Sequence, residues 1–241
     1  WRTYGEYNGI TRHTWMVIVS DAGRVWSIGT GLSTALEGQV WWDDHDLFSD
    51  IGDWLQVRDI AIDAESGLWI AFTGVRGQEG GLCRLDEEAS RWRGYLQSVN
   101  PAILRQVHEV QMDTDGTMWL GGEGGVVVHR PGTPWRRLPL DHLHVRCFLR
   151  DREGYLWLGT DRGIYRAAIE GSDLQGPWQV PSPLVGHEVI GLARDGHGRL
   201  YIAMPHSVSS VDTDGRTRLI LQEEILCLEA DPDGIIWIGT A

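Results

Sequence analysis

Six segments of the 241-residue chain superpose without a gap, and this internal repeat limits the folds that are open to the sequence. In each segment a large apolar residue stands six positions before an aspartate, and another apolar residue stands three positions before it. The aspartates are Asp21, Asp63, Asp113, Asp151, Asp195 and Asp231. The steps between them are 42, 50, 38, 44 and 36 residues, with a mean of 42. Such a period indicates an array of one small supersecondary unit.

Each unit has the pattern of a β-hairpin followed by further short strands. A Gly-containing turn after the aspartate leads to an aromatic residue and then to a small one, eight positions after the aspartate. The aromatic residues are Trp69, Trp119, Trp157, Tyr201 and Trp237, and the small residues are Gly29, Ala71, Gly121, Gly159, Ala203 and Gly239. A third strand is predicted at 81–85, 124–130 and 163–167, and a fourth around Trp92, Trp135 and Trp178. No window shows convincing helical periodicity.

Four short antiparallel strands repeated every 42 residues are typical of the blades of a β-propeller. We therefore predict an all-β fold, a single β-propeller domain over residues 1–241 with about six blades. Its repeat blocks begin near residues 15, 57, 107, 145, 189 and 225. Residues 1–4 are expected to form the outer strand that closes the last blade. That blade then lacks a third strand. We favour the interpretation that the chain was cut from a longer array of up to seven blades. The alternative is that a neighbouring loop fills the place of the missing strand.

Two local features qualify this pattern. In the first unit Trp26 stands five residues after Asp21 and Ser27 takes the aromatic position, which predicts a bulge or a shortened turn. Cys83, Cys147 and Cys227 are far apart and lack a CxxC spacing, so neither a disulfide framework nor a zinc site is indicated. We expect all three to be small buried side chains, and the redox compartment stays open.

The charge balance excludes several classes of function. The chain has 34 acidic residues against 21 basic ones, all of them arginine, for a formal net charge of −13. This excess opposes binding to nucleic acid or to an anionic membrane surface. The lack of lysine excludes a Schiff-base lysine and a P-loop lysine, and no spacing indicates a metal or another cofactor. No apolar run approaches about 18 residues and no signal peptide is present, so the chain, which begins without Met, is expected to be a mature or excised piece.

The string DREGYLWLGTDRGIYRA at 151–167, preceded by VRCFLR, resembles the two-component-regulator propeller repeat. Residues 113–130 and 231–240 follow the same pattern, and so does the opening WRTYGEYNGI. The resemblance implies a non-enzymatic, ligand-sensing input domain of a histidine kinase, hybrid regulator or diguanylate cyclase, often for carbohydrate-derived ligands. It further implies a periplasmic or extracytoplasmic location and an output signalling domain in the parent chain. A homodimer stays open, and the resemblance supplies no fixed set of ligand residues.

Candidate ligand-binding residues come from positions at which the repeats do not have to share a residue type. One residue after the leading apolar position lie Arg58, His108 and Arg146, and the links after the second strands supply Glu123, Asp161, Arg162 and His206. In a propeller these positions share one face at the mouth of the central channel, where we expect them to bind a small anionic or polyhydroxyl ligand, such as an oligosaccharide. Solvated loop charges are the alternative. A candidate aromatic platform lies in or beside the irregular insert 31–56 and consists of Trp15, Trp41, Trp42 and Trp54.

Other readings of these residues stay open. The repeated aspartates are expected to cap their own hairpin turns, and the repeated aromatics to pack between blades, rather than to form a site. A protein-interaction scaffold would use the propeller face, with the insert 31–56 as an anchor. A lyase of the streptogramin or polysaccharide-lyase propeller type would use His108, His206 and Glu123 for proton abstraction beside a carbonyl. The Asp-x-Gly-x-x-Trp spacing also resembles the Asp-box of sialidase propellers, but no arginine triad or tyrosine nucleophile can be assigned.

Overall fold

The computed structural model describes residues 16–19, 23–28, 32–36, 43–45, 55–65, 67–74, 77–86, 91–138, 140, 142–151, 153–170, 173–179, 186–231 and 233–241. Within these ranges the chain forms strands, turns and links but no helix. Accordingly, no described segment is a helix that could span a membrane. The predictions for residues 1–4, Trp15, Trp41, Trp42 and Trp54 lie outside the described residues.

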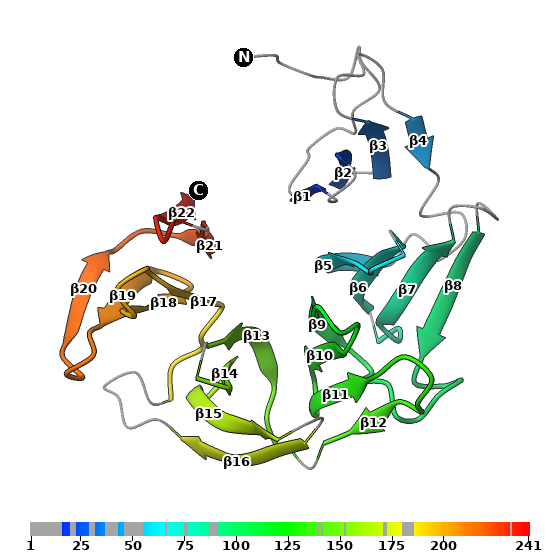
Figure 1. Ribbon diagram of the computed structural model, residues 1–241. Helices are drawn as coiled ribbons and strands as arrows, with labels where there is room; N and C mark the ends of the chain where they lie inside the picture. Colours follow the sequence, from blue (N-terminus) through cyan, green and yellow to red (C-terminus); the bar gives the residue numbers. More distant parts are fainter. Residues whose placement is uncertain are drawn as a thin grey trace. The chain divides into compact units, whose positions relative to one another are not determined.

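Five sheets each have four antiparallel strands that pair in chain order (Figure 1). The first consists of β1 (Met16–Val19), β2 (Arg24–Ile28), β3 (Leu32–Leu36) and β4 (Asp43–His45). The second consists of β5 (Leu55–Ile62), β6 (Leu68–Gly74), β7 (Gly81–Asp86) and β8 (Arg91–Leu96). The third consists of β9 (Val107–Met112), β10 (Met118–Gly122), β11 (Gly125–His129) and β12 (Arg136–Arg137).

The remaining sheets follow the same order. The fourth consists of β13 (Val145–Arg150), β14 (Tyr155–Thr160), β15 (Gly163–Glu170) and β16 (Asp173–Gln179). The fifth consists of β17 (Gly191–Arg194), β18 (Leu200–Met204), β19 (Ser207–Val211) and β20 (Thr217–Leu221). Among the described residues the last sheet has two strands, β21 (Ile225–Ala230) and β22 (Ile236–Thr240). These sheets confirm the predicted four-stranded repeat, including the third and fourth strands, although Trp135 lies just before β12.

The chain divides into two compact units, Trp1–Met118 and Trp119–Ala241. In the first unit β9 packs against β5 and β6, and in the second β17 packs against β13 and β21. Consecutive sheets within a unit are therefore stacked, and their central strands are buried on both faces. This explains why β6 is apolar and buried along nearly its whole length rather than alternating. That the two units form a single closed domain remains a prediction.

The first hairpin corrects one prediction. Trp26 pairs with Ile18, just as Trp69 pairs with Ala61 in the second sheet. The turn of the first hairpin therefore has the ordinary length, and Trp26 occupies the aromatic position of the repeat. The predicted shortened turn is wrong, because five residues separate the paired Val19 and Val25, just as five separate Ile62 and Leu68. A bulge outside the described residues stays a prediction.

The cysteines give a second correction. Cys83 and Cys147 are buried, as expected, but Cys227 is exposed. The Cys147 side chain lies against the next repeat block, with its sulfur 3.9 Å from the carbonyl oxygen of Val189. Cys227 holds the same place in β21, which packs against β17 and β18 of the preceding sheet. The repeat position alone thus does not bury a side chain, because the cover comes from the following block.

Candidate functional site

In a four-stranded sheet, the start of the first strand and the link between the second and third strands lie at the same end of the strands. We call this end of the strands the link edge. In the fourth sheet Val145 pairs with Thr160, which in turn pairs with Gly163 across the link. The same link contacts the next repeat block, because the amide nitrogen of Gly186 donates to the carbonyl oxygen of Arg162 at 3.0 Å. Links at this edge therefore join one blade to the next.

Two of the predicted site residues lie at bulges of this edge. The register between β5 and β6 shifts between Val57 and Asp59, so Arg58 is the extra residue. Arg146 has the same place between Val145 and Cys147 in the fourth sheet. A bulge bends its strand and redirects a side chain, and such positions recur beside binding sites. Arg58 and Arg146 are therefore free of the cross-strand pairing that constrains their neighbours in the strand.

In the first unit the structure places Arg58 and His108 on the neighbouring strands β5 and β9, which pack together. Arg58 is exposed, and its Nε donates to Thr73 Oγ1 at 3.1 Å. His108 is half-buried, one residue from the start of β9. These two candidates therefore belong to one group of link-edge residues within the first unit.

The second unit supplies the larger group. Arg146 forms an ion pair with Glu188 of the next repeat block, with Nη2 and Oε1 3.2 Å apart. Arg162 is exposed, and its Nε lies 4.0 Å from Asp161 Oδ2 in a long ion pair. Its link is held by Thr160 Oγ1, which accepts from the Arg162 amide at 3.0 Å and donates to the Gly163 carbonyl at 2.8 Å. These two hydrogen bonds thus fix the backbone from which the Arg162 side chain extends.

Glu123 and His206 lie at the same edges of the flanking sheets. Glu123 is exposed and forms an isolated β-bridge with His144, whose carbonyl oxygen also accepts from the Asp161 amide at 3.3 Å. His206 is exposed, and the carbonyl oxygen of the preceding residue, Pro205, accepts from the Ile225 amide at 3.0 Å. The structure therefore brings Glu123, Asp161 and Arg162 into one neighbourhood and leaves His206 at a later junction between blades.

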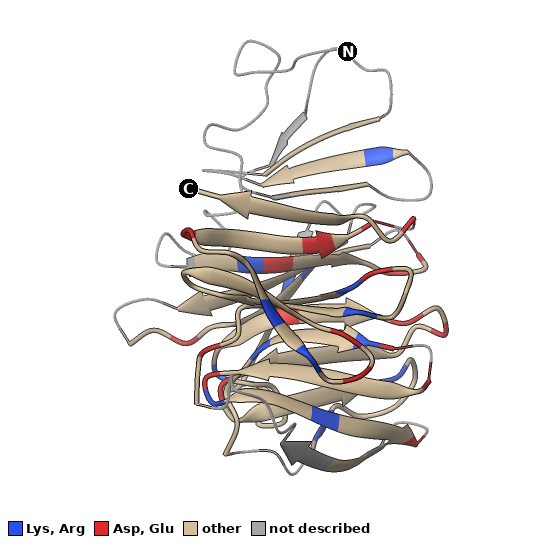
Figure 2. Cartoon of the chain, turned by 90° about the vertical axis from the view of Figure 1, so that its left-hand side faces the viewer, with Lys and Arg blue, Asp and Glu red and all other residues tan. Residues whose placement is uncertain are grey.

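The charges of this group nearly cancel, with one carboxylate in excess. In the second unit Arg146 and Arg162 each lie beside a carboxylate, and Glu123 adds a further negative charge. Many other acidic residues lie in turns and links of the chain (Figure 2). Among the described residues, no group of three or more His, Cys, Asp or Glu side chains could hold a metal ion. What the edge offers is a set of guanidinium and carboxylate groups that can donate and accept hydrogen bonds at fixed positions.

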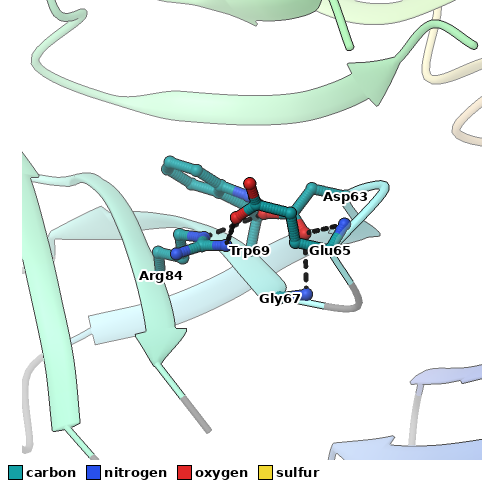
Figure 3. A network of polar contacts seen from close by, with 5 residues as sticks. All are labelled: Asp63, Glu65, Gly67, Trp69 and Arg84. Atoms are coloured by element: carbon teal, nitrogen blue, oxygen red, sulfur yellow. Dashed lines mark hydrogen bonds and ion pairs between the residues drawn. The ribbon is translucent and has the colours of Figure 1, made fainter. Parts of the chain in front are cut away.

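We call the opposite end of the strands the turn edge, and in the second sheet it carries a polar network that sequence reasoning found only in part. Asp63 Oδ1 accepts from the amides of Glu65 and Gly67, which confirms the predicted turn cap. Asp63 Oδ2 accepts from Trp69 Nε1 and from Arg84 Nε, both at 2.8 Å (Figure 3). Burial alone would raise the pKa of Asp63, but the bonds from Arg84, Trp69 and Gly67 and the charge of Arg84 lower it below its usual range.

The fourth sheet repeats this network. Asp151 Oδ1 accepts from the amides of Glu153 and Tyr155, and its Oδ2 accepts from Trp157 Nε1 at 2.8 Å. Arg194 of the next sheet adds an ion pair to Asp151 at 3.7 Å. The indole was missed as a hydrogen-bond donor, although the spacing of six residues between each aspartate and its aromatic residue was the available signal. The described side chains of this network therefore stabilise the turns and the contact between consecutive sheets.

Solved structures similar to this chain share its fold at low sequence identity. The extracellular domain of BT4673 from B. thetaiotaomicron, named as a hybrid two-component system, matches with a TM-score of 0.73 and 17% identity, over 99% of this chain and 32% of that one. Virginiamycin B lyase from Staphylococcus aureus matches with a TM-score of 0.67 and 15% identity, over 93% of this chain and 76% of the lyase. PorZ, a surface component of the type-IX secretion system of Porphyromonas gingivalis, matches with a TM-score of 0.67 and 16% identity, over 95% of this chain and 38% of PorZ.

The fold class follows from these sheets and neighbours: the chain is an all-β propeller protein with about six blades of antiparallel strands. Residues 139–162 and 220–241 match the family described as two component regulator propeller. These two segments thus match the repeat family that the sequence resembles. No curated protein matches the sequence.

Proposed function

We propose that this chain is a non-enzymatic, ligand-sensing input domain of a two-component-type signalling protein, located outside the cytoplasm. The family match at two repeats supports a signalling propeller, and the similarity to an extracellular domain of a hybrid two-component system supports the location. An output domain then belongs to the parent chain. The ligand would bind at the link edge, where Arg146, Asp161, Arg162 and Glu123 gather in the second unit.

The observation that carries the choice of ligand is the pairing of each arginine with a carboxylate. Glu188 balances the charge of Arg146, and Asp161 lies beside Arg162. An anionic ligand would have to displace these carboxylates and approach Glu123 as well. A neutral polyhydroxyl ligand needs no net charge, and its hydroxyl groups can donate to carboxylates and accept from guanidinium groups. We therefore favour a neutral oligosaccharide over an acidic one.

The position of the link edge suggests how binding would be transmitted. The Arg162 carbonyl accepts a hydrogen bond from Gly186, and the Thr160 carbonyl accepts one from Val189, so this link bridges two repeat blocks. A ligand held between Arg162 and Glu188 would contact both blocks at once. It would shift the protein toward the arrangement of blades that it binds more tightly, by as much as its two affinities differ.

A lyase is the competing function, because a virginiamycin B lyase shares the fold. Its proposed residues, however, are not gathered by the described part of the second unit. Glu123 lies at the junction with the fourth sheet, whereas His206 lies at the junction between β18 and β21. Fold similarity alone is weak support for an activity. An enzyme would reveal itself by consuming its ligand.

Calorimetric titration of the 241-residue chain with neutral oligosaccharides and with oligogalacturonides of the same length tests the proposal. We expect the neutral sugars to bind and Arg162→Ala to weaken them about 10-fold or more, because a hydrogen bond to a charged group contributes about 1.5–3 kcal/mol. Arg199→Ala, at the exposed turn edge of β18, is the matched control and should leave binding unchanged. Tighter binding of the acidic sugars, or equal loss in both variants, would refute the proposed site.

A further inference from the structure

The outer strand of the fifth sheet differs from the outer strands of the other four-stranded sheets. An outer strand exposes unpaired backbone groups, and proteins usually protect it with charges or proline. β4 reads Asp-Asp-His, β8 contains Arg91 and Arg93, β12 is Arg136–Arg137 and β16 contains Pro177. β20 reads Thr-Arg-Leu-Ile-Leu, with one charge and no proline.

Two of the three apolar residues of β20 face solvent. Leu219 is 61% exposed and Ile220 is 46% exposed, whereas Leu221 is half-buried. On its inner side β20 pairs with β19, with Leu221 opposite Val208 and Leu219 opposite Ser209. Ile220 is the extra residue at this register shift and has no cross-strand partner in β19. An exposed apolar edge of this kind is typical of a surface that pairs with another strand.

Charged residues flank the apolar segment with opposite signs. Arg216 and Arg218 stand before Leu219, and Glu223 and Glu224 follow Leu221. All four are exposed, and none of them forms an ion pair within the described part of the chain. An antiparallel second copy centred on Ile220 would face Arg216 with the partner subunit's Glu224. A parallel copy would bring like charges together, so the pattern favours an antiparallel partner with the same sequence.

We propose that β20 forms a homodimer contact, in which two copies pair their β20 edges antiparallel about a twofold axis through Ile220. Such an isologous contact continues the fifth sheet from one subunit into the next. A single pair of short strands buries less than the ~1,200 Å² of a standard interface, so we expect a dissociation constant in the micromolar range or weaker. This proposal does not depend on the ligand proposed above.

Sedimentation velocity on the 241-residue chain tests the dimer, at protein concentrations from about 5 to 500 μM and about 0.15 M salt to screen the net charge of −13. We expect a concentration-dependent dimer that Arg218→Glu and Leu219→Lys each convert to monomer. Arg93→Glu, on the outer strand β8, makes the same change of charge and should leave the dimer intact. A monomer at every concentration would overturn the proposal.

A reciprocal charge exchange tests the role of the flanking charges. The variant Arg216→Glu/Arg218→Glu makes both flanks of β20 acidic, and Glu223→Arg/Glu224→Arg makes both basic. Each alone should be monomeric, and a mixture should form a one-to-one heterodimer, because the acidic flanks of one chain then meet the basic flanks of the other. A dimer that persists in both separate variants would place the contact elsewhere. Failure of the mixture to associate, where the original chain dimerises, would show that the flanks of β20 do not form the contact.

Discussion

The indole nitrogen of Trp157 lies 2.8 Å from Oδ2 of Asp151, and the same bond joins Trp237 to Asp231 at 3.1 Å. In both hairpins the other carboxylate oxygen accepts from the amide four residues after the aspartate. The two copies differ in burial, since Trp157 is 9% exposed and Trp237 is 62% exposed. The same hydrogen-bond pattern therefore occurs once in the packed interior, at Asp151, and once at the surface, at Asp231.

Asp151→Ala should destabilise the chain strongly. The Asp151 side chain is fully buried, and its removal leaves Trp157 Nε1 and two backbone amides without their acceptor and Arg194 without its ion pair. Loss of such a buried acceptor costs about 3–5 kcal/mol of unfolding free energy. Asp231→Ala removes the equivalent groups where water can replace them, so it should cost much less. Urea denaturation measures both, and equal losses would show that burial is not the deciding factor.

The Asp63 network predicts a dependence of stability on acid pH. The pKa of Asp63 is lower in the folded chain than the ordinary value of about 3.9, so its stabilisation is fully present above that pH. The stabilisation should disappear as the pH falls through the lower folded pKa. Arg84→Ala removes the donor and charge that hold the carboxylate ionised, and should move the pKa of Asp63 upward. NMR titration of the Asp63 carboxyl checks the shift, and an unchanged pKa in the variant would contradict this explanation.

The three thiols should react at very different rates. Cys227 is exposed, whereas Cys83 and Cys147 are buried and burial raises the pKa of the Cys83 thiol above its usual range. Under native conditions a thiol reagent should label one equivalent rapidly and the remaining two only after unfolding. Cys227→Ser should abolish the rapid phase. Rapid labelling that survives in this variant would mean that one of the other two sites opens readily.

The glycines eight positions after Asp113 and Asp151, Gly121 and Gly159, are explained by close contact with the next block. A Cβ added at Gly159 would contact Cys147 Sγ and lie 2.8 Å from Val189 Cγ1. Gly159→Ala should therefore lower the unfolding free energy by about 1–3 kcal/mol through overpacking. Gly94→Ala is the matched control in β8, because nothing lies within 4 Å of the added Cβ, and it should be neutral or slightly stabilising. Chemical denaturation of both variants separates the effect of space from that of losing a glycine.

Much of this architecture could be predicted from the sequence because the repeat reports local geometry. The aspartate, the turn glycine and the aromatic residue all lie within one hairpin, as Asp63, Gly67 and Trp69 do. Counting from Asp21 misplaced the aromatic position of the first repeat, because Trp26 pairs with Ile18 just as Trp69 pairs with Ala61. The exposure of Cys227 could not be predicted, because it depends on what covers the sheet from outside the hairpin.

The candidate site was less accessible to sequence reasoning. The position of Arg146 could be found because it interrupts an otherwise apolar strand start, and the bulge there gives the physical reason. Its partner Glu188 could not, because 42 residues separate the two and the ion pair depends on how consecutive blocks pack. Carboxylates beside Arg146 and Arg162 changed the expected ligand from anionic or polyhydroxyl to neutral polyhydroxyl. The aromatic platform predicted at Trp15, Trp41, Trp42 and Trp54 stays a prediction.

Thermal unfolding of the 241-residue chain with and without neutral oligosaccharides, followed by mass spectrometry of the sugar, tests the sensing function most directly. At about a hundred times its dissociation constant a ligand stabilises the folded state by about 2.7 kcal/mol. Because 1 kcal/mol shifts Tm by about 2–4 °C in a domain of this size, we predict an increase of about 5–10 °C. The sugar should be recovered intact. A cooperative transition that no oligosaccharide shifts, or a sugar that is converted to product, would contradict a non-enzymatic sugar sensor.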